Sequence, residues 1–335
     1  MISVTQKTLQ DLEFTTILET ISDKCVTELG HQKTLQITPF KNKVILLESL
    51  RQTSEYVSSF SNNNALPNHG FESITNDLKL LSIEDSFLEV NSFRKIAAIS
   101  ETINLLLQFL KKFDDYYPAL NQKAALITYT KIISQKIDEI IDKFGEIKNT
   151  ASPHLLEVRK NINIVRGKVN QSFGIALNQY HALGYLDDIK ESIVENRRVL
   201  AVLAMYRKKV KGSILGNSKT GSIAYIEPEA TLHYSRELNN LEYEEKEEIL
   251  KILKKLTAEI HPFHDLLQQY QEFLSDIDVI AAKAKYAYSI NGILPNITEE
   301  KRLYFKEAFH PILYLNNKKK GVITYPQTIE LHNES

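Results

Sequence analysis

The sequence predicts a mainly α-helical protein in which a long pair of helices carries a small antiparallel β module at its tip. Three observations lead to this fold class. Glycine and proline number 11 and 9 among 335 residues, about half of their ordinary usage, so helices can run long without interruption. Apolar residues make up 43% of the chain and charged residues 25%, which suits amphipathic helices. One internal segment, residues 189–226, is instead rich in β-branched and aliphatic residues, which favour strands.

The N-terminal part predicts four helices. Leu18, Ile21, Cys25 and Leu29 recur at spacings of three and four, which predicts one helix over residues 9–29 that ends at Gly30. Further helices are expected over residues 43–60, 91–113 and 119–144, with a loop rich in Asn, Pro and Gly after the first of these. At about 100–200 residues per domain, the whole chain has room for two or three domains.

The central part predicts two long helices with the β module between them. Ser152-Pro153 opens the first helix, because serine can cap it and proline at the first position loses no hydrogen bond. Strands are expected over residues 193–194, 199–205, 210–215 and 223–226, with turns at 195–198 and 216–221. Pro228 then starts a helix that reaches residue 271 with a kink at Pro262. After Gly292 the chain is expected to be extended.

Composition excludes several classes of protein. Basic side chains number 41 and acidic ones 42, so any nucleic-acid binding must come from local charge. A single cysteine, Cys25, rules out a disulfide framework and a cysteine-based zinc site. The longest apolar run is about eight residues, far below the ~18 needed to cross a bilayer. We therefore expect a cytoplasmic protein without a membrane partner.

A search for chemical motifs finds no catalytic constellation. His261 and His264, with Asp265 beside them, could share a helix face, but no third metal ligand is evident. The pattern Gly-x-x-x-x-Gly-Lys-Ser/Thr of a phosphate-binding loop is absent from the sequence. We therefore expect this chain to hold no metal and no cofactor, and to catalyse no reaction.

Local charge is the main functional signal. Residues 189–221 carry eight basic and two acidic side chains, a net charge of +6, and residues 227–248 carry eight acidic and two basic ones, a net charge of −6. A basic tip on an acidic stalk would direct a polyanion to the tip, because lysine and arginine bind phosphates. The alternative is a solvated hairpin surface. The candidate DNA-binding residues are Arg197, Arg198, Arg207, Lys208, Lys209, Lys211 and Lys219.

Several short motifs follow one another in a characteristic order along the chain. They are Thr27-Glu28-Leu29-Gly30, Ala151-Ser152-Pro153, Ile226-Glu227-Pro228, Ala282-Lys283-Ala284 and His310-Pro311-Ile312-Leu313. Together they resemble the MutS family, in the branch that lacks the mismatch-recognition domains and contains the anti-recombination and Smr-containing proteins. The matches cover nearly the whole chain, and their order and spacing carry the resemblance.

The resemblance implies a division into domains. Residues 1–150 and 262–295 would form a core helical domain, residues 151–180 and 228–261 an outgoing and a returning lever helix, and residues 181–227 a clamp. Residues 296–335 would begin an ATPase domain. The chain would then be a fragment that ends before the phosphate-binding loop of that domain.

The resemblance also implies a function. The clamp would bind double-stranded or branched DNA, in recombination suppression and DNA repair. It would belong to a longer homodimeric protein that binds ATP and Mg²⁺ and that in some relatives carries a nuclease domain. Two alternatives stay open, namely binding of the ribosome or structured RNA at stalled ribosomes, and a coiled-coil scaffold for dimerisation. This fragment itself would not be an enzyme.

Overall fold

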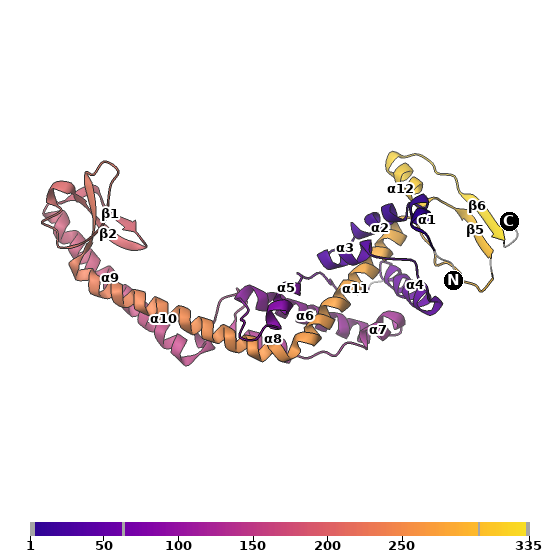
Figure 1. The fold of residues 1–335 in the computed structure, drawn as a ribbon, viewed down its shortest axis with the longest axis horizontal. Helices are drawn as coiled ribbons and strands as arrows, with labels where there is room; N and C mark the ends of the chain where they lie inside the picture. Colours follow the sequence, from indigo (N-terminus) through magenta and orange to yellow (C-terminus); the bar gives the residue numbers. More distant parts are fainter. Residues whose placement is uncertain (1–3, 62–63, 301, 333–335) are drawn as a thin grey trace. The chain divides into compact units, whose positions relative to one another are not determined.

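The computed structural model describes residues 4–61, 64–300 and 302–332. They form a mainly helical structure with a four-stranded antiparallel sheet and a separate two-stranded sheet. This confirms the predicted fold class. The chain divides into two compact units, the first made of residues 1–137 and 257–335 and the second of residues 138–256. Figure 1 labels the elements along the chain.

The first unit is built around one central helix, α11 (His264–Ser289). Thirteen of its residues are buried, and it packs against α2, α3, α4, α5 and α6. The surrounding helices are α1 (Gln6–Asp11), α2 (Phe14–Ser22), α3 (Glu28–Leu35), α4 (Lys43–Ser58), α5 (Thr75–Leu81), α6 (Val90–Lys112), α7 (Pro118–Ala124) and α8 (Ile132–Ile140). The helices predicted over residues 43–60 and 91–113 are therefore confirmed as α4 and α6.

The helix predicted over residues 9–29 is wrong, because three short helices occupy this region. Glu13 has a left-handed backbone with φ of 51° between α1 and α2. Thr27 is extended and caps α3, since its side-chain oxygen accepts a hydrogen bond from the backbone N–H of Gly30 at 3.0 Å. A capping threonine with an extended backbone begins a new helix, and α2 has already ended at Ser22.

The helix predicted over residues 119–144 is also wrong, because α7 and α8 are separate. An extended segment lies between them and is bound to the central helix through Tyr270. The Tyr270 hydroxyl donates to the carbonyl of Thr128 at 3.0 Å and accepts from the N–H of Thr130 at 3.2 Å. These bonds satisfy backbone groups that a helix would otherwise pair within itself.

A buried carboxylate joins the N-terminal helices to α11. Asp278 has no exposed surface, and it accepts hydrogen bonds from the N–H of Val26 at 3.0 Å and from the N–H and hydroxyl of Thr27 at 2.9 and 2.6 Å. His69 adds a bond from Nε2 at 3.1 Å. Gly30 is needed beside this group, because a Cβ there would lie 2.2 Å from Asp278 Oδ2.

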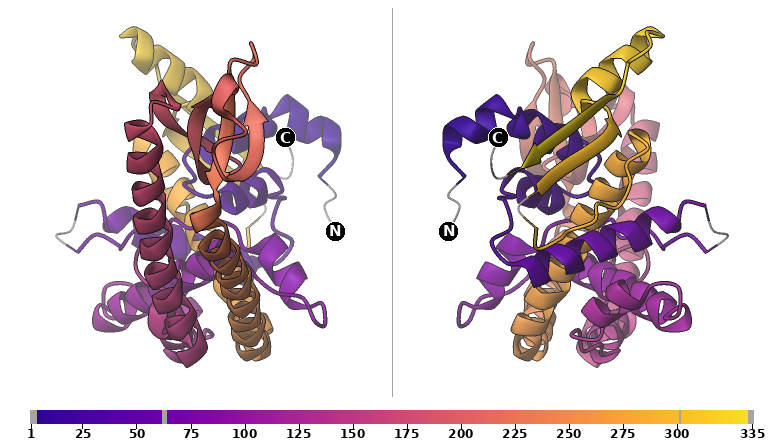
Figure 2. Two further views of the ribbon diagram at one scale, coloured as in Figure 1. Left: turned by 90° about the vertical axis from the view of Figure 1, so that its left-hand side faces the viewer. Right: turned by 90° about the vertical axis from the view of Figure 1, so that its right-hand side faces the viewer.

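The second unit contains a pair of antiparallel helices, α9 (Pro153–Ala182) and the greater part of α10 (Glu229–Ile260), which run side by side in Figures 1 and 2. As predicted, Ser152 caps α9 by accepting from the N–H of Leu155 at 3.0 Å, with Pro153 at the first position. Ion pairs Arg159–Glu245 at 2.7 Å and Arg166–Glu242 at 3.1 Å cross the two helices. Acidic residues of α10 thus stabilise the pairing.

The strands lie between these helices, as predicted, but their limits differ. They are β1 (Leu186–Val194), β2 (Arg197–Leu203), β3 (Gly212–Asn217) and β4 (Ile223–Pro228). Arg197 and Arg198, predicted in a turn, begin β2; the turn consists of Glu195 and Asn196, both with positive φ, as a tight hairpin requires. Pro228 ends β4 rather than starting α10.

The predicted break at Pro262 is confirmed. Helix α10 ends at Ile260, a 3-10 turn spans His261–Phe263, and α11 follows. Near the C-terminus, β5 (Arg302–Ala308) pairs antiparallel with β6 (Gln327–His332). The helix α12 (Pro311–Lys320) between them corrects the expectation of an extended chain after Gly292. Its signals are local: a side-chain cap from His310, Pro311 at the first position and Gly321 with φ of 69° after the end. Among the described residues, no helix is long and apolar enough to span a membrane.

Candidate nucleic-acid interface

The four strands and their connections, residues 186–228, form what we call the sheet module. Leu200, Val202, Ala224 and Ile226 alternate along β2 and β4 and turn their side chains to one face of the sheet. There they pack with Phe173, Ala176 and Tyr180 from the C-terminal half of α9 in one hydrophobic core. The left view of Figure 2 has the sheet beside this part of the helix. The core makes the sheet module continuous with α9.

A crossover segment, residues 204–211, carries most of the basic residues. The strand order is β1-β2-β4-β3, so the chain must pass β4 to reach β3 from β2. Both ends of the segment are held: the N–H of Ala204 donates to the carbonyl of Ser222 at 2.9 Å, and the carbonyl of Lys211 accepts from the N–H of Glu229 at 3.0 Å. Val210 is buried in the core. The intervening side chains of Arg207, Lys208 and Lys209 are exposed.

Two of the seven predicted DNA-binding residues are already engaged. Arg197 pairs with the buried carboxylate of Glu227 at 3.1 Å. Arg198 pairs with Glu191 at 2.6 Å, and its guanidinium lies 4.3 Å from the ring centre of Phe173. Both arginines are half-buried. Their charges are compensated within the module, so they contribute to its packing and register more than to a free cationic surface.

The remaining five basic residues are exposed: Arg207, Lys208, Lys209, Lys211 and Lys219. In the described part of the chain, Arg207, Lys208, Lys211 and Lys219 form no ion pair. Lys219 lies in the turn between β3 and β4, and the bond from Ala204 to Ser222 brings this turn beside the start of the crossover segment. Lys211 lies at the opposite end of that segment. The structure therefore distributes the free charge along the crossover and one adjoining turn.

Three aromatic residues of the sheet module and its supporting helix were not predicted from the sequence. Tyr180, Tyr185 and Tyr206 form a stack in which the rings of Tyr185 and Tyr206 are 4.6 Å apart. The ammonium of Lys209 lies 5.6 and 5.5 Å from these two ring centres. The signal available in the sequence was the presence of tyrosines next to a run of basic residues, a combination typical of nucleic-acid surfaces.

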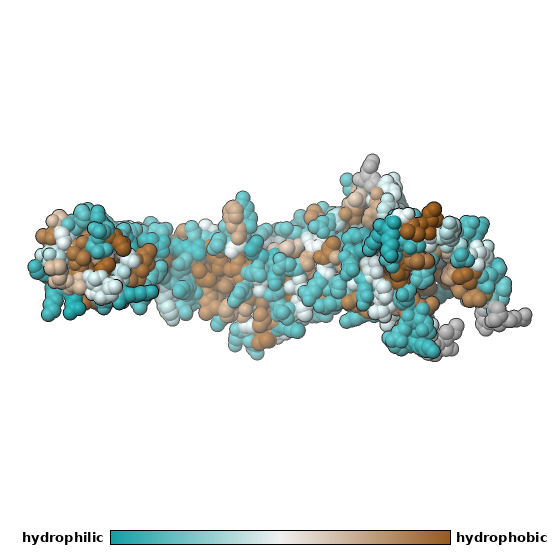
Figure 3. All heavy atoms as spheres, turned by 90° about the horizontal axis from the view of Figure 1, so that it is seen from above, coloured by the Kyte–Doolittle hydropathy of each residue, from teal (hydrophilic) through white to brown (hydrophobic). Residues whose placement is uncertain are grey.

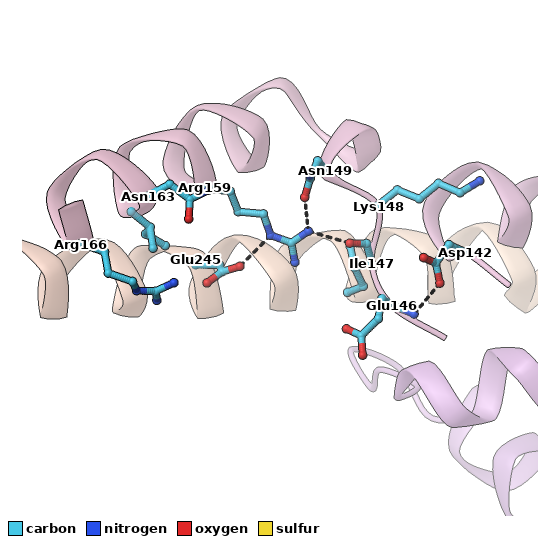
Figure 4. Close-up of a pocket in the computed structure, with 10 residues that line it drawn as sticks. Asp142, Glu146, Ile147, Lys148, Asn149, Arg159, Asn163, Arg166 and Glu245 are labelled. Carbon is cyan, nitrogen blue, oxygen red and sulfur yellow. Dashed lines mark hydrogen bonds and ion pairs between the residues drawn. The ribbon is translucent and has the colours of Figure 1, made fainter. Parts of the chain in front are cut away.

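A pocket between α9 and α10 has a structural explanation. It is open, with a volume of about 540 Å³, and its lining includes Arg159, Arg166, Glu245 and Asp142 (Figure 4). Arg159 fills its centre and uses its donors on Glu245 and on the carbonyl of Ile147 at 2.7 Å each. Hydrogen bonds from the backbone N–H of Glu146 and Phe144 lower the pKa of Asp142. Arg159 thus joins the start of α9 to α10 and to the segment that precedes α9.

The two histidines considered as metal ligands lie at the junction of α10 and α11. His264 Nδ1 lies 3.0 Å from the carboxylate of its neighbour Asp265. His261 belongs to the 3-10 turn before it. No group of three or more histidine, cysteine, aspartate or glutamate side chains among the described residues could hold a metal ion.

Fold and surface together define a class of protein, one in which a pair of long antiparallel helices bears a small, basic sheet module. No family model matches the chain. A protein of Carboxydothermus hydrogenoformans named Endonuclease MutS2 is 30% identical over 317 residues, which cover 92% of this chain and 39% of that protein. Proteins of the same name from Staphylococcus carnosus and Alkaliphilus oremlandii are 26% and 27% identical over 97% and 93% of the chain.

These proteins are homologues of the chain along nearly its whole length. The chain spans about two fifths of the length of these curated relatives. The comparison supports the resemblance to the MutS family that the sequence motifs indicated.

Proposed function

We propose that the sheet module is a DNA-binding surface, and that its target is double-stranded or branched DNA. The observation that carries the proposal is the set of exposed cations without ion pairs in the described structure, Arg207, Lys208, Lys211 and Lys219, on and beside one short crossover segment. Such side chains bind phosphates by releasing counterions, without reading the base sequence. The name Endonuclease MutS2 of the relatives refers to an activity on nucleic acid, which agrees with this assignment.

We infer that the biological setting is recombination suppression or DNA repair, in a protein of the relatives' length that forms a homodimer. ATP and Mg²⁺ would be bound by other parts of such a protein. The residues of this chain do not fit that role, because its sequence has no phosphate-binding loop pattern. The chain would contribute binding and hydrolyse nothing. Light scattering over a range of concentrations tests whether these 335 residues already dimerise.

The first experiment measures binding to three labelled ligands by fluorescence anisotropy. The ligands are a four-way DNA junction, a linear duplex of the same sequence and a structured RNA, each at two salt concentrations. We expect tight, salt-sensitive binding to both DNA ligands, and tighter binding to the junction. Tighter binding to the RNA would overturn the assignment to DNA and favour the ribosome or RNA alternative. No binding at low salt would refute the surface itself.

A matched pair of variants then localises the contact. Lys208→Ala removes one exposed cation of the crossover segment, and we expect the slope of log K against log salt to fall by about 0.9 for duplex DNA. All sequences should lose affinity alike, because a phosphate contact carries no sequence information. The control is Lys254→Ala, an exposed lysine of α10 outside the sheet module, which should leave the slope unchanged. Equal slopes for both variants would remove Lys208 from the interface.

A further inference from the structure

The tyrosine stack joins the end of α9, the residue before β1 and the start of the crossover segment. Tyr180 lies in the last turn of α9, Tyr185 between α9 and β1, and Tyr206 in the 3-10 turn Ala204–Tyr206 that opens the crossover segment. The rings of Tyr180 and Tyr185 are 6.4 Å apart with an interplanar angle of 25°, and those of Tyr185 and Tyr206 are 4.6 Å apart with an angle of 22°. Tyr185 is therefore the middle ring and Tyr206 an end of the stack.

The hydrophobic core and backbone hydrogen bonds support the stack on the side of Tyr180. Tyr180 is 9% exposed and belongs to the hydrophobic core of the sheet module, and its hydroxyl accepts a hydrogen bond from the N–H of Lys211 at 3.2 Å. The backbone of Tyr185 accepts from the N–H of Leu203 at 3.0 Å and donates to the carbonyl of Tyr180 at 3.1 Å. Tyr185 and Tyr206 are themselves only partly buried. An aromatic surface that is fixed in advance loses little entropy when a ligand stacks on it.

Basic residues lie beside the Tyr206 end of the stack and follow it in the sequence. The ammonium of Lys209 is almost equally distant from the centres of Tyr185 and Tyr206, 5.6 and 5.5 Å, so it lies beside the pair and does not cover the outer face of Tyr206. Arg207 and Lys208 follow Tyr206 directly and are exposed. Met205, on the other side in the chain, is 76% exposed. Asp187 and Asp188 in β1 are the acidic residues nearest to Tyr185 in sequence and reduce the local positive charge.

Exposed apolar side chains within a charged surface are unusual for a purely phosphate-binding site. In Figure 3, the sheet module, which Figure 1 labels β1 and β2, has hydrophobic residues surrounded by hydrophilic ones. Phosphates of a duplex need cations alone, since the bases of a duplex are stacked inside it. A partly exposed aromatic ring that is followed directly by arginine and lysine suits a strand whose bases are accessible.

We propose that Tyr206, backed by Tyr185, is a stacking platform for an unpaired nucleobase, with Arg207, Lys208 and Lys209 binding the adjoining phosphates. This inference rests on the proposed function and names its ligand more closely: a single-stranded segment, such as the unpaired nucleotides of a branched structure. Stacking of one base on an aromatic side chain strengthens binding about 5- to 150-fold. It tolerates any sequence, because every base has a π-face.

The test compares four ligands that differ in their bases or their sugar. They are a labelled dT12 strand, an abasic strand with the same number of phosphates, and a 12-base-pair duplex, with a U12 strand added to distinguish DNA from RNA as the source of the unpaired bases. Tyr206→Leu should weaken dT12 binding about 5- to 150-fold and change abasic and duplex binding less than about twofold. Tyr206→Phe keeps the ring and should bind dT12 like the unchanged protein. Lys208→Ala should weaken all ligands alike.

The outcomes separate this inference from the proposed function. If Lys208→Ala weakens every ligand while Tyr206→Leu weakens none, the surface binds nucleic acid but the platform is refuted. If Tyr206→Leu weakens all ligands equally, or Tyr206→Phe is as weak as Tyr206→Leu, the residue supports the loop and is no platform. If the unchanged protein binds none of the ligands at low salt, both the proposed function and the platform are refuted.

Discussion

Replacement of the buried carboxylate Asp278 by asparagine should destabilise the first unit strongly. Asp278 is fully buried on α11 and receives hydrogen bonds from Thr27, Val26 and His69. Asparagine has nearly the same shape, but one of its two terminal groups is an N–H₂ group, which cannot accept a hydrogen bond. The donors that face this group therefore lose their acceptor. If the amide nitrogen takes the place of Oδ2, the N–H and hydroxyl of Thr27, now 2.9 and 2.6 Å from that oxygen, lose their acceptor.

The magnitude follows from these two donors. A buried donor left without an acceptor costs about 1–3 kcal/mol, so we expect Asp278→Asn to lower the free energy of unfolding by about 3 kcal/mol. Asp276→Asn is the matched control, two residues away on the same helix. Asp276 forms ion pairs with Lys33 at 2.6 Å and Lys123 at 2.7 Å, but its side chain is 39% exposed. Exposed pairs contribute about 0–1 kcal/mol each, so the control should lose no more than about 2 kcal/mol.

Two probes show in which unit the free energy of unfolding is lowered. Urea unfolding followed by far-UV circular dichroism reports on helices of the whole chain. Cys25 is the single cysteine, lies beside Thr34 in the first unit at 3.3 Å, and is half-buried, and burial raises the pKa of its thiol. Its labelling rate with a thiol reagent therefore reports on opening of this region alone. Equal effects of Asp278→Asn and Asp276→Asn on both probes would refute the reasoning.

The pH dependence provides an independent check. Burial by itself raises the pKa of Asp278, but hydrogen bonds from His69 and Thr27 outweigh it and hold the pKa below its ordinary value. A carboxylate with a lowered pKa stabilises the folded chain above its unfolded pKa of about 3.9 and loses this contribution as pH falls further. The stability difference between the unchanged protein and Asp278→Asn should therefore be constant near neutral pH and narrow below about pH 4. A difference that widens in acid would contradict the assignment.

The remaining predictions concern single side chains and are all measured by urea unfolding. Gly167→Ala and Gly174→Ala on α9 should each stabilise by about 0.5–1 kcal/mol, because a Cβ at either position meets nothing within 4 Å; a loss of stability would mean that this helix face is covered. Gly30→Ala should instead destabilise, owing to the clash with Asp278. Ser152→Ala should cost about 1 kcal/mol as the cap of α9 is lost, and an unchanged midpoint would show that the cap is replaced. Arg159→Met should cost about 2 kcal/mol by breaking charged hydrogen bonds to Glu245 and Ile147, and a neutral effect would mean that packing of the methionine compensates.

The helices and strands of the central part could be predicted from local sequence patterns. The scarcity of glycine and proline left α9 and α10 uninterrupted, Ser152-Pro153 marked the start of α9, and Pro262 marked the end of α10. β-branched residues between the helices indicated the strands. Each of these signals acts on residues only a few positions away. A short stretch of sequence therefore already contains the interactions that form the element.

The first helices of the chain could not be predicted in this way. The apolar spacing of Leu18, Ile21, Cys25 and Leu29 is helical, yet α2 ends at Ser22 and α3 begins only at Glu28. The break is stabilised by Asp278, which is 251 residues away from Thr27. A hydrogen bond between such distant residues leaves no trace in a local pattern, and it outweighed the helical propensity of the segment.

The candidate nucleic-acid interface was likewise predicted only in part. By itself, the sequence determined that seven basic residues gather in one short segment of a nearly neutral chain. The tertiary structure decided which of them are free: strand pairing sets Arg197 against Glu227 and Arg198 against Glu191, and the crossover leaves Arg207 and Lys208 exposed. It also stacked Tyr206 on Tyr185, 21 positions apart in the sequence. Charge is a property of each residue and can be counted, whereas its compensation depends on neighbours that only folding brings within a few ångströms.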